Sequence, residues 1–114
     1  MSRSQIEYLQ HILDETVYLI EQSKGLTKEK FIQNGTLKRA FIRSLEIIGE
    51  ATKNLSMELR NKYSHIQWRG LAGMRDKLIH HYFGVDYDIV WDVVTNYIPT
   101  LQDEVHQIMQ DEEI

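Results

Sequence analysis

The sequence predicts an all-α fold, an up-and-down bundle of four main helices with one short extra helix. Apolar residues recur at steps of three and four almost everywhere, which is the spacing of one helix face. Only one proline and six glycines interrupt this pattern, so no strand is expected. A chain of 114 residues usually buries one hydrophobic core, and residues 1–114 are therefore expected to form a single domain.

The first half of the chain is expected to form three helices. An apolar stripe predicts a helix over residues 4–23, and Gly25 follows its end. Thr27 is a suitable N-cap for a short helix that runs to about residue 33. After the Asn34-Gly35 turn signal, a long helix is expected over residues 36–63, with a continuous core face.

The second half is expected to form two helices, over residues 64–82 and from Asp86 or Asp88 to the end of the chain. The sequence Phe83-Gly84-Val85 separates them, and either aspartate would suit a helix start because the helix dipole favours a carboxylate there. Pro99 lies inside the last helix and lacks the N–H of a helical hydrogen bond. We therefore expect a kink at Pro99.

Composition excludes several classes of protein. No apolar run approaches the length of a membrane span, and the N-terminus has no secretory pattern. With no cysteine, disulfides are excluded and a cytoplasmic location is expected. The net charge of −4 argues against a protein that coats nucleic acid electrostatically.

The charges are distributed unevenly along the chain. Residues 27–77 carry eleven Lys or Arg and five Asp or Glu, whereas residues 78–114 carry eight acidic residues and no Lys or Arg. The basic segment could bind phosphate, or the two segments could simply pair with each other in the fold. Charge alone leaves both open.

Arg75 interrupts the apolar arc of the helix predicted over residues 64–82. A guanidinium needs partners for its five donors, so this residue must face a carboxylate, a phosphate or a cleft. The structural alternative is a buried ion pair with an acid from a neighbouring helix. Tyr82 falls in the same arc by the same angular arithmetic.

His80 and Asp76 are the other polar candidates of this segment. In an ideal helix His80 lies about 140° around the axis from Arg75, so the two meet only if the arginine wraps round or if a second chain contributes. Asp76 is four residues before His80, where a carboxylate could orient the imidazole and raise its pKa. Taken singly, His80 is more often the kind of histidine that simply faces solvent.

Metal binding is not expected at the adjacent pair His80 and His81. Neighbouring helical residues diverge by about 100°, and no acidic cluster or zinc-binding spacing accompanies them. No cofactor is predicted either. A polar stripe on the third helix, bordered by Gly49, could be solvated or could be the place where a helix of a second subunit approaches.

The run from Trp68 to Trp91, WRGLAGMRDKLIHHYFGVDYDIVW, together with RSLEIIGEA at residues 43–51, resembles the HEPN superfamily and most closely the HepT toxins. The resemblance covers nearly the whole chain. The pattern Arg-x4-His alone is weak evidence for the family, because many helices contain it by chance. The pattern Arg-x4-His-x-Tyr followed by Phe-Gly-x-Asp-Tyr is far more specific. It implies that Arg75 and His80 are the catalytic pair of a ribonuclease and that Tyr82 is the motif tyrosine.

The resemblance also implies partners. HepT toxins pair with a minimal nucleotidyltransferase antitoxin, which silences them by binding and by transferring AMP to the motif tyrosine, here Tyr82. A homodimer would place two His80 and two Arg75 around one RNA, so that cleavage needs no metal and leaves a 2′,3′-cyclic phosphate. From charge alone, Lys77 and Arg69 are candidates for further RNA contacts.

Two other functions stay open. The chain could be a non-catalytic helical adaptor that presents substrate to a nucleotidyltransferase, which the acidic composition favours. It could also be a plain dimeric interaction module in which Arg75 forms an ion pair. The presence of all three motif residues favours the nuclease.

Overall fold

The computed structural model describes residues 1–81 and 84–113, with residues 79–81 described by their backbone alone. In these residues the prediction of an all-α bundle is confirmed. The elements in order are α1 (Arg3–Ser23), α2 (Lys28–Gln33), α3 (Gly35–Lys53), α4 (Met57–Lys62), α5 (Trp68–Ala72), α6 (Met74–Leu78), β1 (Ile79–His81), β2 (Gly84–Val85), α7 (Tyr87–Asp92), the π-helical segment η1 (Val93–Tyr97) and α8 (Ile98–Asp111).

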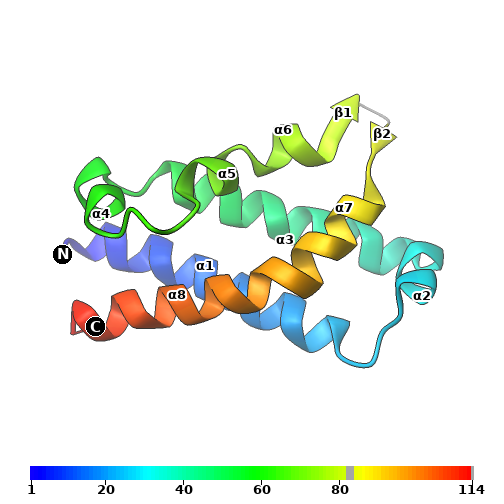
Figure 1. Ribbon diagram of the computed structural model, residues 1–114, viewed down its shortest axis with the longest axis horizontal. Helices are drawn as coiled ribbons and strands as arrows, with labels where there is room; N and C mark the ends of the chain where they lie inside the picture. Colours follow the sequence, from blue (N-terminus) through cyan, green and yellow to red (C-terminus); the bar gives the residue numbers. More distant parts are fainter. Residues whose placement is uncertain (82–83, 114) are drawn as a thin grey trace.

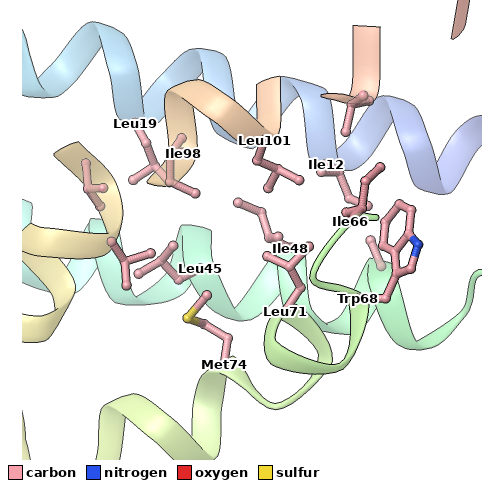
Figure 2. Packing of buried hydrophobic residues seen from close by; sticks show 14 of the residues in the cluster. Ile12, Leu19, Leu45, Ile48, Ile66, Trp68, Leu71, Met74, Ile98 and Leu101 are labelled. Atoms are coloured by element: carbon pink, nitrogen blue, oxygen red, sulfur yellow. The ribbon is translucent and has the colours of Figure 1, made fainter. Parts of the chain in front are cut away.

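The bundle is built around α1, which packs against both α3 and α8 (Figure 1). The short helices α5 and α6 lie along α3. Figure 2 shows the apolar side chains that meet between these elements, among them Leu19 of α1, Leu45 of α3 and Leu71 of α5. No helix in the described part of the chain is long and apolar enough to cross a membrane.

Side-chain caps begin the first three helices. Thr27 caps α2 as predicted, and its side-chain oxygen accepts a hydrogen bond from the Lys30 N–H at 3.2 Å. Asn34 caps α3 through the Leu37 N–H at 3.0 Å. Helix α1 begins one residue earlier than predicted, at Arg3, because Ser2 is its N-cap.

The helix predicted over residues 36–63 is two helices. Helix α3 ends at Lys53, and Ser56 caps α4 through the Leu59 N–H at 3.1 Å. The end of α3 is stabilised by Arg60, whose guanidinium donates to the Thr52 carbonyl oxygen at 2.6 Å. The apolar spacing continues across this break, which is why the sequence pattern did not reveal it.

The continuous helix predicted over residues 64–82 is wrong, because its described part contains two short helices and a strand. Gly73 ends α5, α6 has only five residues, and β1 pairs antiparallel with β2. The expectation of no strand is therefore also wrong. A backbone hydrogen bond of 3.1 Å from the Asp86 N–H to the Leu78 carbonyl oxygen closes the base of this hairpin.

The last helix begins as predicted and bends by an unexpected means. Asp86 is the N-cap, and its carboxylate accepts hydrogen bonds from the Asp88 and Ile89 N–H groups, each at 3.1 Å. Before Pro99 the chain forms η1, in which the Ile98 N–H bonds to the Val93 carbonyl oxygen. The helix changes direction between α7 and α8 (Figure 1). The bend occurs through the wider π-helical turn of η1, where a simple proline kink was expected.

Candidate active site

Helix α6 presents three charged residues to solvent from a firmly anchored backbone. Met74 and Leu78 lie one turn apart and are both buried, with exposed fractions of 4% and 2%. Arg75, Asp76 and Lys77 lie between these two anchors and are exposed. The buried first and last residues of the short helix therefore hold it on the core, and its outer surface is charged.

Gly49 of α3 allows α5 and α6 to approach the bundle closely. A β-carbon at this position would lie 3.1 Å from the Leu71 carbonyl oxygen and 3.8 Å from the Met74 Cβ. Gly49 is buried. The close approach that the sequence suggested for a helix of a second subunit is thus made within this chain.

Arg75 is not in an apolar centre. The arc predicted around it assumed a continuous helix, and the break at Gly73 changes the direction in which α6 faces. Its side chain is exposed and forms no ion pair or hydrogen bond with other described residues. The alternative of a buried ion pair is therefore wrong, and the guanidinium is accessible to an anion from solution.

His80 lies in β1, immediately after α6. The backbone changes from helix to strand at Ile79, so the angle of about 140° expected from an ideal helix does not describe Arg75 and His80. For the same reason Asp76 and His80 are not helical neighbours. The side chain of His80 and the whole of Tyr82 lie outside the described residues.

Two ion pairs connect the basic middle of the sequence to its acidic end. The Lys28 ammonium lies 2.9 Å from the Asp88 carboxylate, and the Lys62 ammonium lies 2.8 Å from Glu112. Each raises the pKa of its lysine, chiefly through the hydrogen bond to the carboxylate. Part of the uneven charge distribution is therefore explained by ion pairs within the fold, the second of the two explanations given above.

A groove that sequence analysis did not identify lies beside α6. It has a volume of about 270 Å³, and we call it the α6–η1 groove. Buried Leu71, Met74 and Val93 line it, together with the exposed polar residues Lys77, Asp92 and Asn96. The available signal was the four-residue spacing of Asp92 and Asn96 just before Pro99.

Tyr97 lies at the side of this groove and is poorly solvated. Its hydroxyl is buried without a hydrogen-bond partner among the described residues. Burial raises the pKa of Tyr97 to about 12, with a further rise from Glu104 and an opposing effect of the Gln67 backbone. Burial also raises the pKa of Glu104, which His65 opposes.

Nothing in the described residues resembles a metal centre. No group of three or more His, Asp or Glu side chains is placed to hold an ion there. The exposed cations of α6, Arg75 and Lys77, can bind an anionic substrate.

The all-α bundle, together with the family match, identifies the chain as a HEPN-type protein. The family model described as "Ribonuclease HepT-like" matches residues 6–108. The chain belongs to the HepT-like ribonuclease family.

Several relatives are similar over nearly their whole length. A protein of Caldanaerobacter subterraneus subsp. tengcongensis named "Putative RNase" is 54% identical over 105 residues, which are 92% of this chain and 94% of the relative. One of the same name from Methanocaldococcus jannaschii is 43% identical over 91% of this chain and 86% of its own. A "Probable ribonuclease HepT" of Thermococcus cleftensis is 39% identical over 95% and 98%. No solved structure is significantly similar to the chain.

Proposed function

We propose that this protein is the toxin of a toxin–antitoxin pair and that it cleaves RNA without a metal ion, through Arg75 and His80. Membership of a ribonuclease family supports RNA as the substrate. The main observation behind the assignment is that Arg75 is exposed on α6, a helix whose two end residues are buried. The strand that contains His80 follows directly. An exposed arginine without a described protein partner is available to bind a phosphate.

The proposed reaction is a transfer within one nucleotide. His80 accepts the proton of the ribose 2′-hydroxyl, and the 2′-oxygen then attacks the adjacent phosphorus. The bond from phosphorus to the 5′-oxygen breaks, and that oxygen takes a proton from a general acid. Arg75 binds the non-bridging oxygens as their charge increases. The products are a 2′,3′-cyclic phosphate and a free 5′-hydroxyl.

A homodimer would supply the second proton-transfer group. One His80 cannot be neutral base and protonated acid at the same moment, whereas two copies related by a two-fold axis can divide these roles. Asp76, which is exposed on α6, is proposed to support the protonated form of a His80 by its negative charge. Sedimentation or light scattering of the purified protein tests the dimer.

The antitoxin is proposed to be a nucleotidyltransferase. Transfer of AMP would form a bond between the Tyr82 phenol oxygen and the α-phosphorus of ATP, releasing pyrophosphate and the phenol proton. The added nucleotide would bring bulk and negative charge next to the position of the substrate phosphate. Mass spectrometry after coexpression tests this step, because a silenced complex with unmodified Tyr82 would leave binding as the only inhibition.

The central experiment compares purified wild type, Arg75→Ala and His80→Ala on a short single-stranded RNA with EDTA present. We expect both variants to lose at least about a hundredfold in rate, as for other groups that stabilise charge in a transition state. His106→Ala is the matched control, since His106 is exposed on α8. Wild-type activity that disappears in EDTA, or full activity of His80→Ala, would refute the proposed mechanism.

The adaptor function is distinguished in the same experiment. An adaptor would cleave nothing as wild type, and expression would not arrest growth. It would still bind a nucleotidyltransferase, and binding would be insensitive to His80→Ala.

A further inference from the structure

We propose that the α6–η1 groove binds a nucleobase of the RNA, beside the helix that presents Arg75, and that Asp92 and Asn96 select bases with an exocyclic amino group. This inference rests on the proposed ribonuclease function and adds a specificity site to it.

The groove has the make-up of a small-ligand site. Three buried apolar residues, Leu71, Met74 and Val93, line it and offer a surface for the face of a planar ring. Its volume of about 270 Å³ is enough for one base.

The polar groups of the groove form a defined recognition edge. Asn96 Nδ2 donates a hydrogen bond to Asp92 Oδ1 at 2.7 Å, which fixes the two side chains relative to each other. The amide oxygen of Asn96 and the second carboxylate oxygen of Asp92 have no described protein partner and are acceptors. An acceptor edge matches the exocyclic amino groups of adenine, cytosine and guanine. Uracil offers only its ring N3–H, between two carbonyl oxygens that the acceptors repel.

The π-helical segment explains why these groups face the groove. Pro99 has no N–H to donate, and the chain accommodates it through η1, whose wider turn contains Val93, Asn96 and Tyr97. All three of these residues line the groove. Such π-helical insertions cost stability and are frequent at functional sites.

The groove is connected to the proposed cleavage site by α6. Lys77 lines the groove, whereas Arg75, two residues earlier on the same helix, does not. A base in the groove would therefore have its own phosphate near Lys77, and the RNA would continue round α6 to Arg75.

The first test measures binding without cleavage. Backbone amide shifts of the wild-type protein are recorded by NMR as 5′-AMP, CMP, GMP or UMP is added. We expect the three amino-bearing nucleotides to shift the amides of Lys77, Val93 and Asn96, and UMP to bind at least about tenfold more weakly. No shift in these residues, or shifts that follow protein concentration because a second copy fills the groove, would overturn the proposal.

The second test measures selectivity in cleavage. Cleaved ends of a random-sequence RNA are mapped for wild type, Asp92→Asn and Asp103→Asn. Asp92→Asn replaces an acceptor with a donor and should reduce the discrimination against uridine about tenfold. Asp103 is exposed on α8 and serves as the matched control. An unchanged base preference in Asp92→Asn would overturn the proposal. If wild type cleaves nothing, the ribonuclease function fails and the binding measurement alone decides on the groove.

Discussion

Gly49 of α3 and Leu71 of α5 approach so closely that a β-carbon at position 49 would lie 3.1 Å from the Leu71 carbonyl oxygen. The obstacle is backbone, which cannot rotate away as a side-chain end can. We expect Gly49→Ala to destabilise the protein by about 1–2 kcal/mol, because overpacking outweighs the gain in helix propensity. Denaturant unfolding measures the change.

Gly70 provides the matched control for this prediction. It also lies in a helix, but a β-carbon there would meet nothing within 4 Å. Gly70→Ala should therefore be neutral or stabilising by up to about 1 kcal/mol. Equal stability of the two alanine variants would show that α5 can move away from α3 at no cost.

Arg75 should matter for activity and not for stability. The side chain is exposed and has no described ion pair, so Arg75→Ala should change the free energy of unfolding by less than about 0.5 kcal/mol. Arg75→Lys keeps the charge but loses the planar pair of donors, and we expect it to recover only part of the cleavage rate. Full activity of the lysine variant would show that charge alone is sufficient.

Two helix caps that depend on local chemistry were predicted correctly. Thr27 and Asp86 cap helices through hydrogen bonds to residues two or three positions away, so a short window of sequence contains the whole interaction. The core face predicted across residues 36–63 also holds, since Leu55 and Leu59 are both buried. The all-α class follows from these local signals.

Two of the errors come from contacts between residues that lie eight positions apart, which a local pattern does not include. The end of α3 depends on Arg60, whose guanidinium reaches back to the Thr52 carbonyl oxygen. The hairpin depends on the hydrogen bond from Asp86 to Leu78. Because α5 ends at Gly73, an angle calculated for one long helix placed Arg75 on the wrong surface. Its accessibility, on which the proposed function depends, could only come from the structure.

Phe31 is the residue through which the short helix α2 is held on the bundle. Its ring is fully buried and stacks on Phe41 of α3 and Trp91 of α7, with centroid distances of 4.9 and 5.4 Å. We expect Phe31→Ala to cost about 3–5 kcal/mol in the free energy of unfolding. The neighbouring Ile32 is 38% exposed, so Ile32→Ala should cost far less, and similar losses in both variants would contradict this role.

Tyr97 should make the protein sensitive to alkaline pH. The pKa of its phenol is raised by burial from 10.0 to about 12, so between these values the unfolded chain releases a proton that the folded protein retains. Folding stability contributed by this group is therefore complete below pH 10 and decreases as pH rises toward 12, by up to about 1.4 kcal/mol per pH unit. Tyr97→Phe should remove this component and leave the stability at neutral pH nearly unchanged or slightly higher, because the buried hydroxyl has no described partner. Chemical denaturation from pH 8 to 11 measures how steeply the free energy of unfolding falls with pH, with Tyr8→Phe on α1 as the control. If Tyr97→Phe left this slope unaltered, the hydroxyl would be solvated in the folded protein.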